Sequence, residues 1–326
     1  MNLPFEKQNP KILVKAQGVT DPKLGCDPYQ RPIEELIHNG ILNLNKPAGP
    51  TSHQVTDDVK KMFHLPKCGH SGTLDPLVTG VLPIALDKAT RSVQVLLTAG
   101  KEYVCLMHIH KPIEEQIIRK AFQDYQGEIS QLPPVKSAVK RQLRKRTIYY
   151  IEILEIEGQD ILFKIGCQAG TYIRKYVHDL GLKLQTKAHM AQLVRTKAGP
   201  FTDKNMFSLH DVKDAYEIYL QTKEESKLRK IILPIEAAVE HLPKIWVFDS
   251  AVDPLCHGAP LYVQGIVKLH DTIKRGSQVA IFTLKNELIS IAIAECSAEQ
   301  ILEKQKGIAT NNAKVFMERK TYKLTP

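Results

Sequence analysis

The chain has 326 residues, of which 45 are Lys or Arg and 35 are Asp or Glu, so its formal net charge is +10. A hydrophobic fraction of 43% and a charged fraction of 25% exclude a fully disordered or fibrous chain. The length suggests about two domains. The positive charge indicates an acidic partner, with nucleic acid as the first candidate and an anionic membrane surface as the second.

The cysteines do not predict a metal ribbon or a disulfide framework. There are six, none lies near another, and no Cys-x-x-Cys occurs. We expect reduced thiols in a cytoplasmic protein. The N-terminal residues lack the apolar run of a signal peptide, and no apolar run in the sequence approaches the ~20 residues of a membrane helix. The sequence therefore predicts a cytoplasmic protein without a membrane segment.

The first compact element is predicted after a long polar segment. Residues 1–39 contain prolines and show no sustained periodicity, so we expect an extended arm that packs on another part of the protein. Residues 40–46 alternate apolar and polar side chains, which predicts a short strand that Pro47 stops. Thr51 and Gln54 then form the capping-box pattern of a helix start.

The middle of the chain mixes strands and helices. Residues 149–156 and 161–167 predict two paired strands, with residues 157–160 as the turn between them. Residues 172–184 then have a helical pattern. Because these elements do not follow a regular βαβ spacing, the sequence favours an α+β domain over a doubly wound sheet.

The pattern changes near residue 243. Residues 203–242 are predicted to be mostly helical, including the charged stretch 223–227. Beyond residue 243, short strand candidates separated by Gly-rich or polar turns are typical of a small β-barrel. These candidates are residues 246–248, 261–263, 266–269, 279–282 and 288–293. We therefore place a domain boundary near residue 243.

Most of the positive charge is concentrated in residues 136–197. This segment has thirteen Lys or Arg against five Asp or Glu, a net charge of +8. A single basic run is usually a solvated face, but an imbalance over so long a segment favours contact with phosphates. A membrane-surface helix is disfavoured because the charges are interleaved with predicted strands. The candidates for phosphate contact are Lys140, Arg141, Arg144 and Arg146.

Residues 69–83 stand out as a candidate reactive loop. They contain three glycines and two prolines, which indicates a constrained loop that runs into a buried apolar segment. Asp75 precedes Pro76 and is therefore biased towards an extended backbone. A carboxylate on a rigid loop is a candidate nucleophile or base. A turn aspartate that bonds its own backbone is the alternative, and the residue types alone leave both open.

A family resemblance starts from this loop. Gly-His-Ser-Gly-Thr-Leu-Asp-Pro, at residues 69–76, resembles the catalytic motif of the TruB/dyskerin family of RNA pseudouridine synthases. Further segments resemble the family's other motifs, in the right order and over nearly the whole chain. These segments are residues 46–52, 99–103, 170–174 with 179–181, and 197–201. Residues 137–141 and 147–158 resemble the archaeal branch, the catalytic subunit of H/ACA guide-RNA particles.

The resemblance implies a fold and a domain organisation. The fold would be α+β, with a mixed-sheet pseudouridine synthase catalytic domain at residues 40–243. A small β-barrel PUA domain, which binds RNA, would occupy residues 244–319. Residues 1–39 would form the N-terminal arm and residues 320–326 a short tail.

The resemblance also implies an activity and partners. The chain would isomerise specific uridines in RNA to pseudouridine, with no cofactor and no metal. It would act on rRNA within an H/ACA particle, directly on the pseudouridine loop of tRNA, or on both. Its partners would be tRNA, rRNA, H/ACA guide RNA and three proteins: a small zinc-ribbon protein, a Gly-Arg-rich-type protein and a kink-turn-binding ribosomal-type protein. The alternative from another class is a non-catalytic RNA-binding scaffold built on the PUA module.

Three residues would carry the chemistry according to the resemblance. Asp75 would be the catalytic carboxylate. Arg174 would pair with Asp75 and keep the acid ionised in a water-poor pocket. Tyr172 would sit against the base and could help to remove its C5 proton. A scaffold has no need of these three side chains together with Tyr103, so the presence of all four favours the enzyme.

Three further residues would contact the substrate according to the same resemblance. The target base must leave the RNA stack to reach the catalytic carboxylate. Tyr103 would then stack on the base. His70 would support the RNA around the target, and a structural histidine is the alternative. Leu193 would complete the substrate-binding set.

Overall fold

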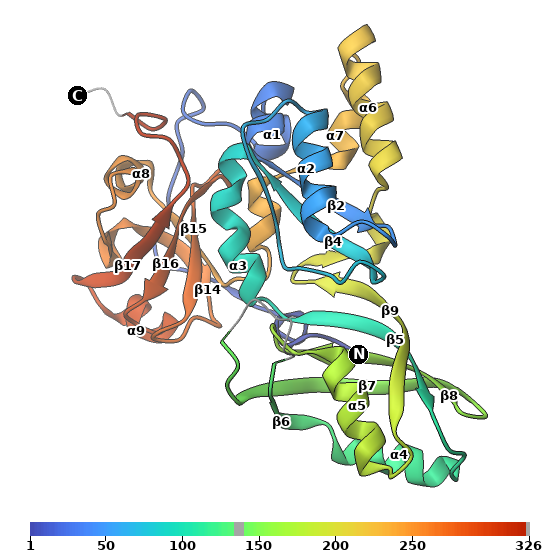
Figure 1. The fold of residues 1–326 in the computed structure, drawn as a ribbon. Helices are drawn as coiled ribbons and strands as arrows, with labels where there is room; N and C mark the ends of the chain where they lie inside the picture. The colour runs from blue at the N-terminus through green and yellow to red at the C-terminus, as the bar shows by residue number, and fades with distance from the viewer. Residues whose placement is uncertain (134–139, 324–326) are drawn as a thin grey trace. The chain divides into compact units, whose positions relative to one another are not determined.

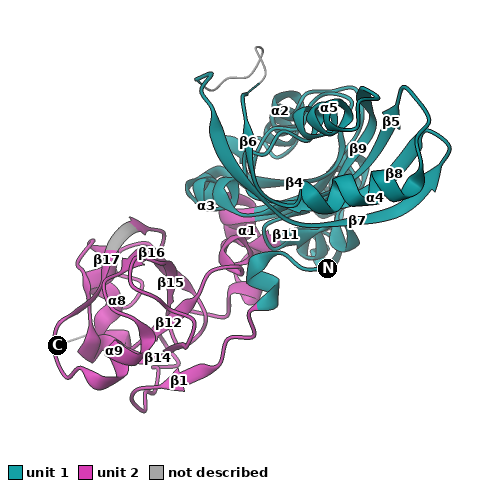
Figure 2. Ribbon diagram, turned by 90° about the horizontal axis from the view of Figure 1, so that it is seen from below, with its two compact units in different colours: residues 1–7, 41–232 teal, residues 8–40, 233–326 magenta. Residues whose placement is uncertain are grey.

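The computed structural model describes residues 1–133 and 140–323. The chain forms two compact units: residues 1–7 and 41–232 make unit 1, and residues 8–40 and 233–326 make unit 2 (Figure 2). The segment expected to be an N-terminal arm is thus divided between the two units. Residues 137–139, which begin one of the archaeal-type segments, lie outside the described residues.

Unit 1 is built on a mixed sheet (Figure 1). Its strands follow the order β2-β4-β9-β5-β8-β7-β6, with β3 paired to β4 and β10 to β9. The strands are β2 (Gly40–Lys46), β3 (Cys68–His70), β4 (Thr79–Leu86), β5 (Lys101–Ile109), β6 (Gly127–Gln131), β7 (Arg144–Glu157), β8 (Asp160–Cys167), β9 (Ala188–Ala198) and β10 (Phe201–Thr202). Only β4 and β9 run parallel among these pairs. The mixed sheet confirms the predicted α+β class.

Helices cover this sheet. They are α2 (Ser52–Met62), α3 (Val93–Thr98), α4 (Glu115–Asp124), α5 (Ile173–Lys183), α6 (Leu209–Thr222) and α7 (Ser226–Ile231). The aromatic core joins α4 and α5 to β8: the rings of Phe122 and Phe163 lie 5.0 Å apart, and Tyr176 is fully buried. This packing fixes the first turn of α5, which carries Arg174, relative to the sheet.

Most predicted elements of unit 1 are confirmed. β2 coincides with the predicted strand, β7 and β8 form the predicted antiparallel pair, and α5 lies within residues 172–184. The capping box is present: Thr51 Oγ1 accepts from Gln54 N–H at 3.1 Å, and Gln54 Oε1 accepts from Thr51 N–H at 2.7 Å.

The predicted helical stretch 203–242 is wrong in part. Lys223 ends α6 with a left-handed φ of +61°, so the charged residues that follow separate two helices. After α7 the chain forms the short strand β11 (Ile232–Pro234), in which it passes from unit 1 to unit 2. Ile232 is β-branched, and Pro234 disfavours the helical conformation of Leu233, so extended backbone is favoured over helix there.

Unit 2 contains a seven-stranded sheet in the order β1-β14-β12-β15-β16-β17-β13. Its strands are β1 (Ile12–Val14), β12 (Lys244–Val247), β13 (Leu261–Tyr262), β14 (Ile266–His270), β15 (Gln278–Phe282), β16 (Leu288–Ala294) and β17 (Ile308–Val315). Its helices are α1 (Ile33–Asn39), α8 (Asp249–Cys256) and α9 (Ala298–Glu303). The five strands predicted after residue 243 are confirmed, whereas β1 and β17 were missed. β1 pairs with β14, so the N-terminal segment adds a strand to this sheet.

Candidate active site

Hydrogen bonds fix the backbone on both sides of Asp75, in the loop between β3 and β4. On one side, Ser52 Oγ accepts from Leu74 N–H at 2.8 Å and donates to Leu74 O at 3.1 Å. On the other side, Val78 N–H donates to Asp75 O at 3.0 Å. Ser52 is the first residue of α2 and is fully buried. The start of α2, capped by Thr51, therefore positions the loop.

Lys46 holds the same loop from the end of β2. Its side chain is fully buried, and Nζ donates to Pro47 O at 2.8 Å, Pro76 O at 2.9 Å and Val78 O at 3.0 Å. These acceptors use all three N–H groups of the ammonium. Burial lowers the pKa of Lys46, and the nearby charge of Asp75 opposes that shift. Lys46 thus ties the loop to the central sheet.

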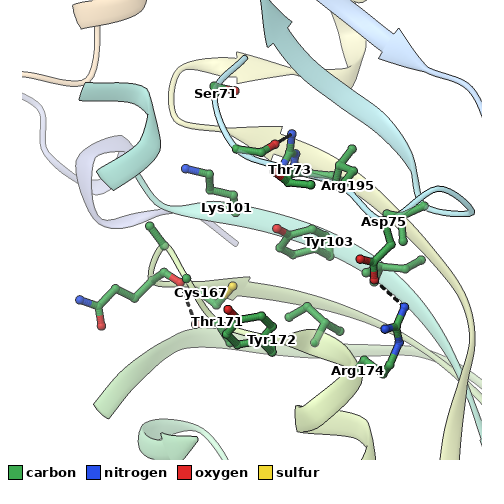
Figure 3. A pocket seen from close by; sticks show the side chains of 18 of the residues that line it. Ser71, Thr73, Asp75, Lys101, Tyr103, Cys167, Thr171, Tyr172, Arg174 and Arg195 are labelled. Atoms are coloured by element: carbon green, nitrogen blue, oxygen red, sulfur yellow. Dashed lines mark hydrogen bonds and ion pairs between the residues drawn. The ribbon is translucent and has the colours of Figure 1, made fainter. Parts of the chain in front are cut away.

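A cavity of about 670 Å³ opens beside Asp75 (Figure 3). Five of the six residues predicted to carry chemistry or contact substrate line it: Asp75, Tyr103, Tyr172, Arg174 and Leu193. They come from the loop, β5, α5 and β9, which are far apart in the sequence. The fold therefore brings these predicted residues together around one pocket.

Asp75 and Arg174 form an ion pair at this pocket. Arg174 Nη2 lies 2.5 Å from Asp75 Oδ2, and Figure 3 shows the two side chains pointing toward each other. Their side chains are 51% and 61% exposed, respectively. The pairing agrees with the sequence-based expectation, but the water-poor surroundings do not. Exclusion of water from this pair requires a ligand that covers it.

Tyr172 immediately precedes α5, and a buried glutamine fixes its backbone. Its N–H donates to Gln131 Oε1 at 3.0 Å, and its carbonyl accepts from Gln131 Nε2 at 3.2 Å. Gln131 is buried at the end of β6. These two bonds hold the pocket wall next to Arg174.

Tyr103 on β5 lies opposite the buried Arg195 on β9. Burial raises the pKa of Tyr103, and the Arg195 guanidinium, which hydrogen-bonds its hydroxyl, partly offsets that shift. Arg195 Nε donates to Val81 O at 2.7 Å, and Nη2 donates to Gly72 O at 3.2 Å. At Gly80 (φ +102°) an added Cβ would lie 2.2 Å from Arg195 O, so only glycine allows β4 and β9 to approach this closely.

Lys101, at the start of β5, also lines the pocket. Its ammonium donates to Leu96 O at 2.7 Å, Leu97 O at 3.2 Å and Ala99 O at 2.7 Å, at the C-terminal end of α3. Burial lowers the pKa of Lys101 to about 7, and the charge of Arg195 acts in the same direction. Sequence reasoning assigned no role to Lys46, Lys101 or Arg195. The only signal was that both lysines belong to motifs that carry the family resemblance.

His70 lies next to the pocket but does not line it. Its ring makes an edge contact with His53, 5.0 Å between centroids, and His53 does line the pocket. His70 Nδ1 accepts from Gly72 N–H at 3.3 Å. Burial lowers the pKa of His70 to about 4, so the imidazole is neutral at pH 7. These contacts favour the structural alternative for His70.

The four basic candidates differ in position. Lys140 and Arg141 are exposed and precede β7, whereas Arg144 and Arg146 are half-buried on β7. The guanidinium of Arg146 lies 3.1 Å from the Cβ position of Gly170, a residue of the pocket lining. Of the four, Arg146 therefore borders the pocket.

The described residues contain neither a metal-binding cluster nor a membrane-spanning helix. No three histidine, cysteine or acidic side chains in residues 1–133 and 140–323 gather so as to hold a metal ion. In the same residues, no helix has the length and apolar character needed to cross a membrane. All six cysteines are free thiols.

Four family models match successive parts of the chain. Residues 60–173 match the N-terminal domain of TruB family pseudouridylate synthases, and residues 174–240 match the tRNA pseudouridylate synthase B C-terminal domain. Residues 1–56 match the DKCLD (NUC011) domain, and residues 243–316 match the PUA domain. These matches confirm the resemblance inferred from the motifs.

Curated relatives and solved structures match nearly the full length. The chain is 51% identical to the "Probable tRNA pseudouridine synthase B" of Methanopyrus kandleri, over 98% of this chain and 94% of the relative. It is 53% identical to the protein so named in Methanothermobacter thermautotrophicus, over 94% of each. It is similar, with a TM-score of 0.94 and 52% identity over 99% of each chain, to a chain of the "Cbf5-Nop10-Gar1 Complex". For an "H/ACA RNP bound to a substrate RNA containing 2'-deoxyuridine", the TM-score is 0.93 and the identity 49% over 99% of each chain.

Proposed function

The chain belongs to the TruB family of pseudouridylate synthases, and on that premise we propose that Asp75 is the carboxylate with which it isomerises uridine in RNA. The observation that carries this assignment is the Asp75–Arg174 ion pair at a pocket lined by Tyr103 and Tyr172. The neighbouring backbone is held by buried side chains, so the carboxylate is oriented before substrate binds.

The reaction needs no external group. The bond between N1 and C1′ of the nucleotide breaks, the base turns, and C5 bonds to C1′ while C5 loses a proton and N1 gains one. Asp75 could attack C1′, add to C6 or act at the 2′ position. On each route Arg174, which donates to Asp75 Oδ2, orients the carboxylate toward the bound nucleotide.

RNA completes the site. The target nucleotide turns out of its stack, and its base lies against the ring of Tyr103. Tyr172 lies against the other side of the base, and Leu193 adds apolar surface. The entering nucleotide covers Asp75 and Arg174, so the attraction between them strengthens as water leaves.

We propose that the chain works as the catalytic subunit of an H/ACA particle. The support is its similarity to solved chains in a Cbf5-Nop10-Gar1 complex and in an H/ACA particle bound to substrate RNA. Its partners would be guide RNA, a small zinc-ribbon protein, a Gly-Arg-rich-type protein and a kink-turn-binding ribosomal-type protein. Its substrate would be rRNA. Direct action on the tRNA pseudouridine loop is the second candidate, because relatives are named tRNA pseudouridine synthases.

We also propose the domain roles and the compartment. Residues 40–243 would form the catalytic domain and residues 244–319 the PUA domain, flanked by the arm at residues 1–39 and the tail at residues 320–326.

The net charge of +10 suits a protein that binds RNA. Free thiols suit the reducing cytoplasm. Lys140, Arg141, Arg144 and Arg146 would contact phosphates.

Asp75→Asn tests the catalytic assignment. The change removes the charge and keeps the shape, so we expect RNA affinity within about twofold of wild type and no pseudouridine in a single-turnover assay. Asp58→Asn, at an exposed position on α2, is the matched control and should isomerise at the wild-type rate. Pseudouridine formed by Asp75→Asn would contradict the assignment.

Dependence on a guide RNA is tested by adding or omitting the guide RNA and the partner proteins in the activity assay. The chain alone, and the chain with guide RNA and partner proteins, would each be given unmodified tRNA and an rRNA fragment that pairs with the guide. Conversion of the rRNA fragment only in the full mixture supports the particle. Conversion of tRNA by the chain alone supports the second candidate, and RNA binding without conversion in any mixture supports the non-catalytic scaffold.

A further inference from the structure

Two buried cations line the pocket without an acidic partner. Lys101 is 5% exposed and Arg195 is 1% exposed. Within the described residues neither side chain forms an ion pair; their partners are backbone carbonyls and the hydroxyl of Tyr103. Carbonyls satisfy the N–H groups but do not cancel the charge, and uncompensated buried charge is costly.

A buried cation can hold the backbone in place, or it can act on a ligand through its charge, and Lys46 shows how the two roles differ. Lys46 is as deeply buried as Arg195 and also donates only to carbonyls, but it is not part of the pocket lining. Holding the backbone is a sufficient role for Lys46. Arg195, together with Lys101 in its protonated form, adds positive potential inside the pocket, where a ligand lies in a low dielectric and responds strongly to it. That potential suits a ligand that carries or acquires negative charge.

The position of Arg195 shows which part of a bound ligand would lie close to this positive charge. Arg195 and Tyr103 are paired across β9 and β5, so their side chains share one face of the sheet. Figure 3 shows Tyr103 between Lys101 on one side and Asp75 on the other, with Arg195 beside it. A base lying on Tyr103 therefore comes next to the guanidinium. A guanidinium has five N–H donors, of which Val81 O, Gly72 O and the Tyr103 hydroxyl take three.

We propose that Arg195 is a catalytic residue that stabilises the negative charge that develops on uracil, with Lys101 contributing at longer range; this rests on the proposed function. When the C1′–N1 bond breaks, both electrons stay on the uracil ring and spread to its carbonyl oxygens. Addition at C6 also moves an electron pair onto the ring. A fixed cation beside that ring lowers the energy of the charged species without reorganising during the reaction.

RNA with 5-fluorouridine at the target position tests this proposal. Fluorine withdraws electrons and stabilises negative charge on the ring itself, so the reaction depends less on a protein cation. Arg195→Gln should slow single-turnover consumption of uridine about 100-fold, the loss typical of one oxyanion donor. On the fluorinated RNA the same substitution should slow single-turnover consumption of 5-fluorouridine about 10-fold. Arg195→Lys, which keeps the charge, should recover part of the uridine rate, and Lys101→Gln should give a smaller loss that is again larger for uridine.

Lys46→Gln is the matched control, because it removes a buried carbonyl-bound cation outside the pocket lining. It should slow both RNAs by the same factor. Equal losses on both RNAs for Arg195→Gln and for Lys101→Gln would overturn the proposal and leave both residues with a framework role. That result differs from failure of the proposed function, in which wild type converts neither RNA or Asp75→Asn still converts uridine.

Discussion

The charges of the pocket fall into two groups with opposite surroundings. The Asp75 and Arg174 side chains are 51% and 61% exposed, whereas Lys101 and Arg195 are 5% and 1% exposed. The exposed group is an ion pair, whereas the partners of the buried group within residues 1–133 and 140–323 are carbonyl and hydroxyl oxygens. The fold therefore fixes the supporting charges before RNA binds and leaves the reactive pair accessible until RNA covers it.

This arrangement has a physical consequence. An exposed ion pair contributes about 0–1 kcal/mol because water screens it. The pair therefore gains strength only when the target nucleotide displaces that water. The buried cations keep their orientation with or without RNA. Variants of each group separate these two behaviours.

The largest effect is expected from breaking the exposed pair. Arg174→Met should lower the single-turnover rate about 1000-fold, because Asp75 loses its only ion-pair partner among the described residues as RNA covers it. Folding stability should change by less than about 1 kcal/mol, since the pair is exposed. Arg174→Lys should retain part of the activity. A wild-type rate for Arg174→Met, measured with saturating RNA, would show that the pair is not needed.

The next largest effect is expected from removing the buried charge of Lys46. Lys46→Met leaves Pro47 O, Pro76 O and Val78 O without their buried donor. We expect a loss of about 1–3 kcal/mol in the free energy of unfolding, which urea denaturation measures. The isomerisation rate should fall about 100-fold because the loop that carries Asp75 is no longer held. Unchanged stability would contradict the role assigned to Lys46.

A smaller effect is expected from the four basic residues at the edge of the pocket and outside it. Replacing the four basic residues by Gln should weaken RNA binding about tenfold and reduce the salt slope by up to about 0.7 for each phosphate that is no longer neutralised. The residues to change together are Lys140, Arg141, Arg144 and Arg146. The rate at saturating RNA should stay near wild type. Binding assays at several salt concentrations measure the slope, and an unchanged slope would remove these residues from the RNA surface.

The smallest effect concerns His70 and pH. Burial lowers its pKa to about 4 from an unfolded value of 6.5, so the unfolded chain takes up this proton first as the pH falls. The contribution of His70 to stability is therefore complete above pH 6.5 and declines as the pH falls toward 4. His70→Asn should have a smaller drop in melting temperature between pH 7 and pH 5 than wild type. Equal drops would show that His70 does not titrate in this way.

The sequence predicted the reactive group better than the framework around it. Asp75, Arg174 and Tyr103 lie in short motifs whose order indicates the family, and the fold places all three at one pocket. Lys46 could not be assigned a role, because its function depends on Pro76 O, thirty residues away in the sequence. Arg195 is equally non-local, since it reaches Gly72 O from β9.

The missed strands of unit 2 and the missed break between two helices have weak local signals. β17 contains two consecutive asparagines, which are poor strand formers, and its pairing with β16 and β13 supplies what local propensity lacks. β1 has three residues and exists only as a partner of β14. Lys223 carries a left-handed φ that no helix propensity indicates, so the break between α6 and α7 was not foreseen.

The most direct measurement of the central claim is a structure of the chain in complex with guide RNA and a substrate RNA that carries an unreactive uridine analogue at the target. We expect the uracil ring to lie against Tyr103, out of the RNA stack, with C1′ or C6 next to the Asp75 carboxylate and the ion pair with Arg174 retained. A target base still stacked in the RNA, with Asp75 facing solvent, would contradict this expectation.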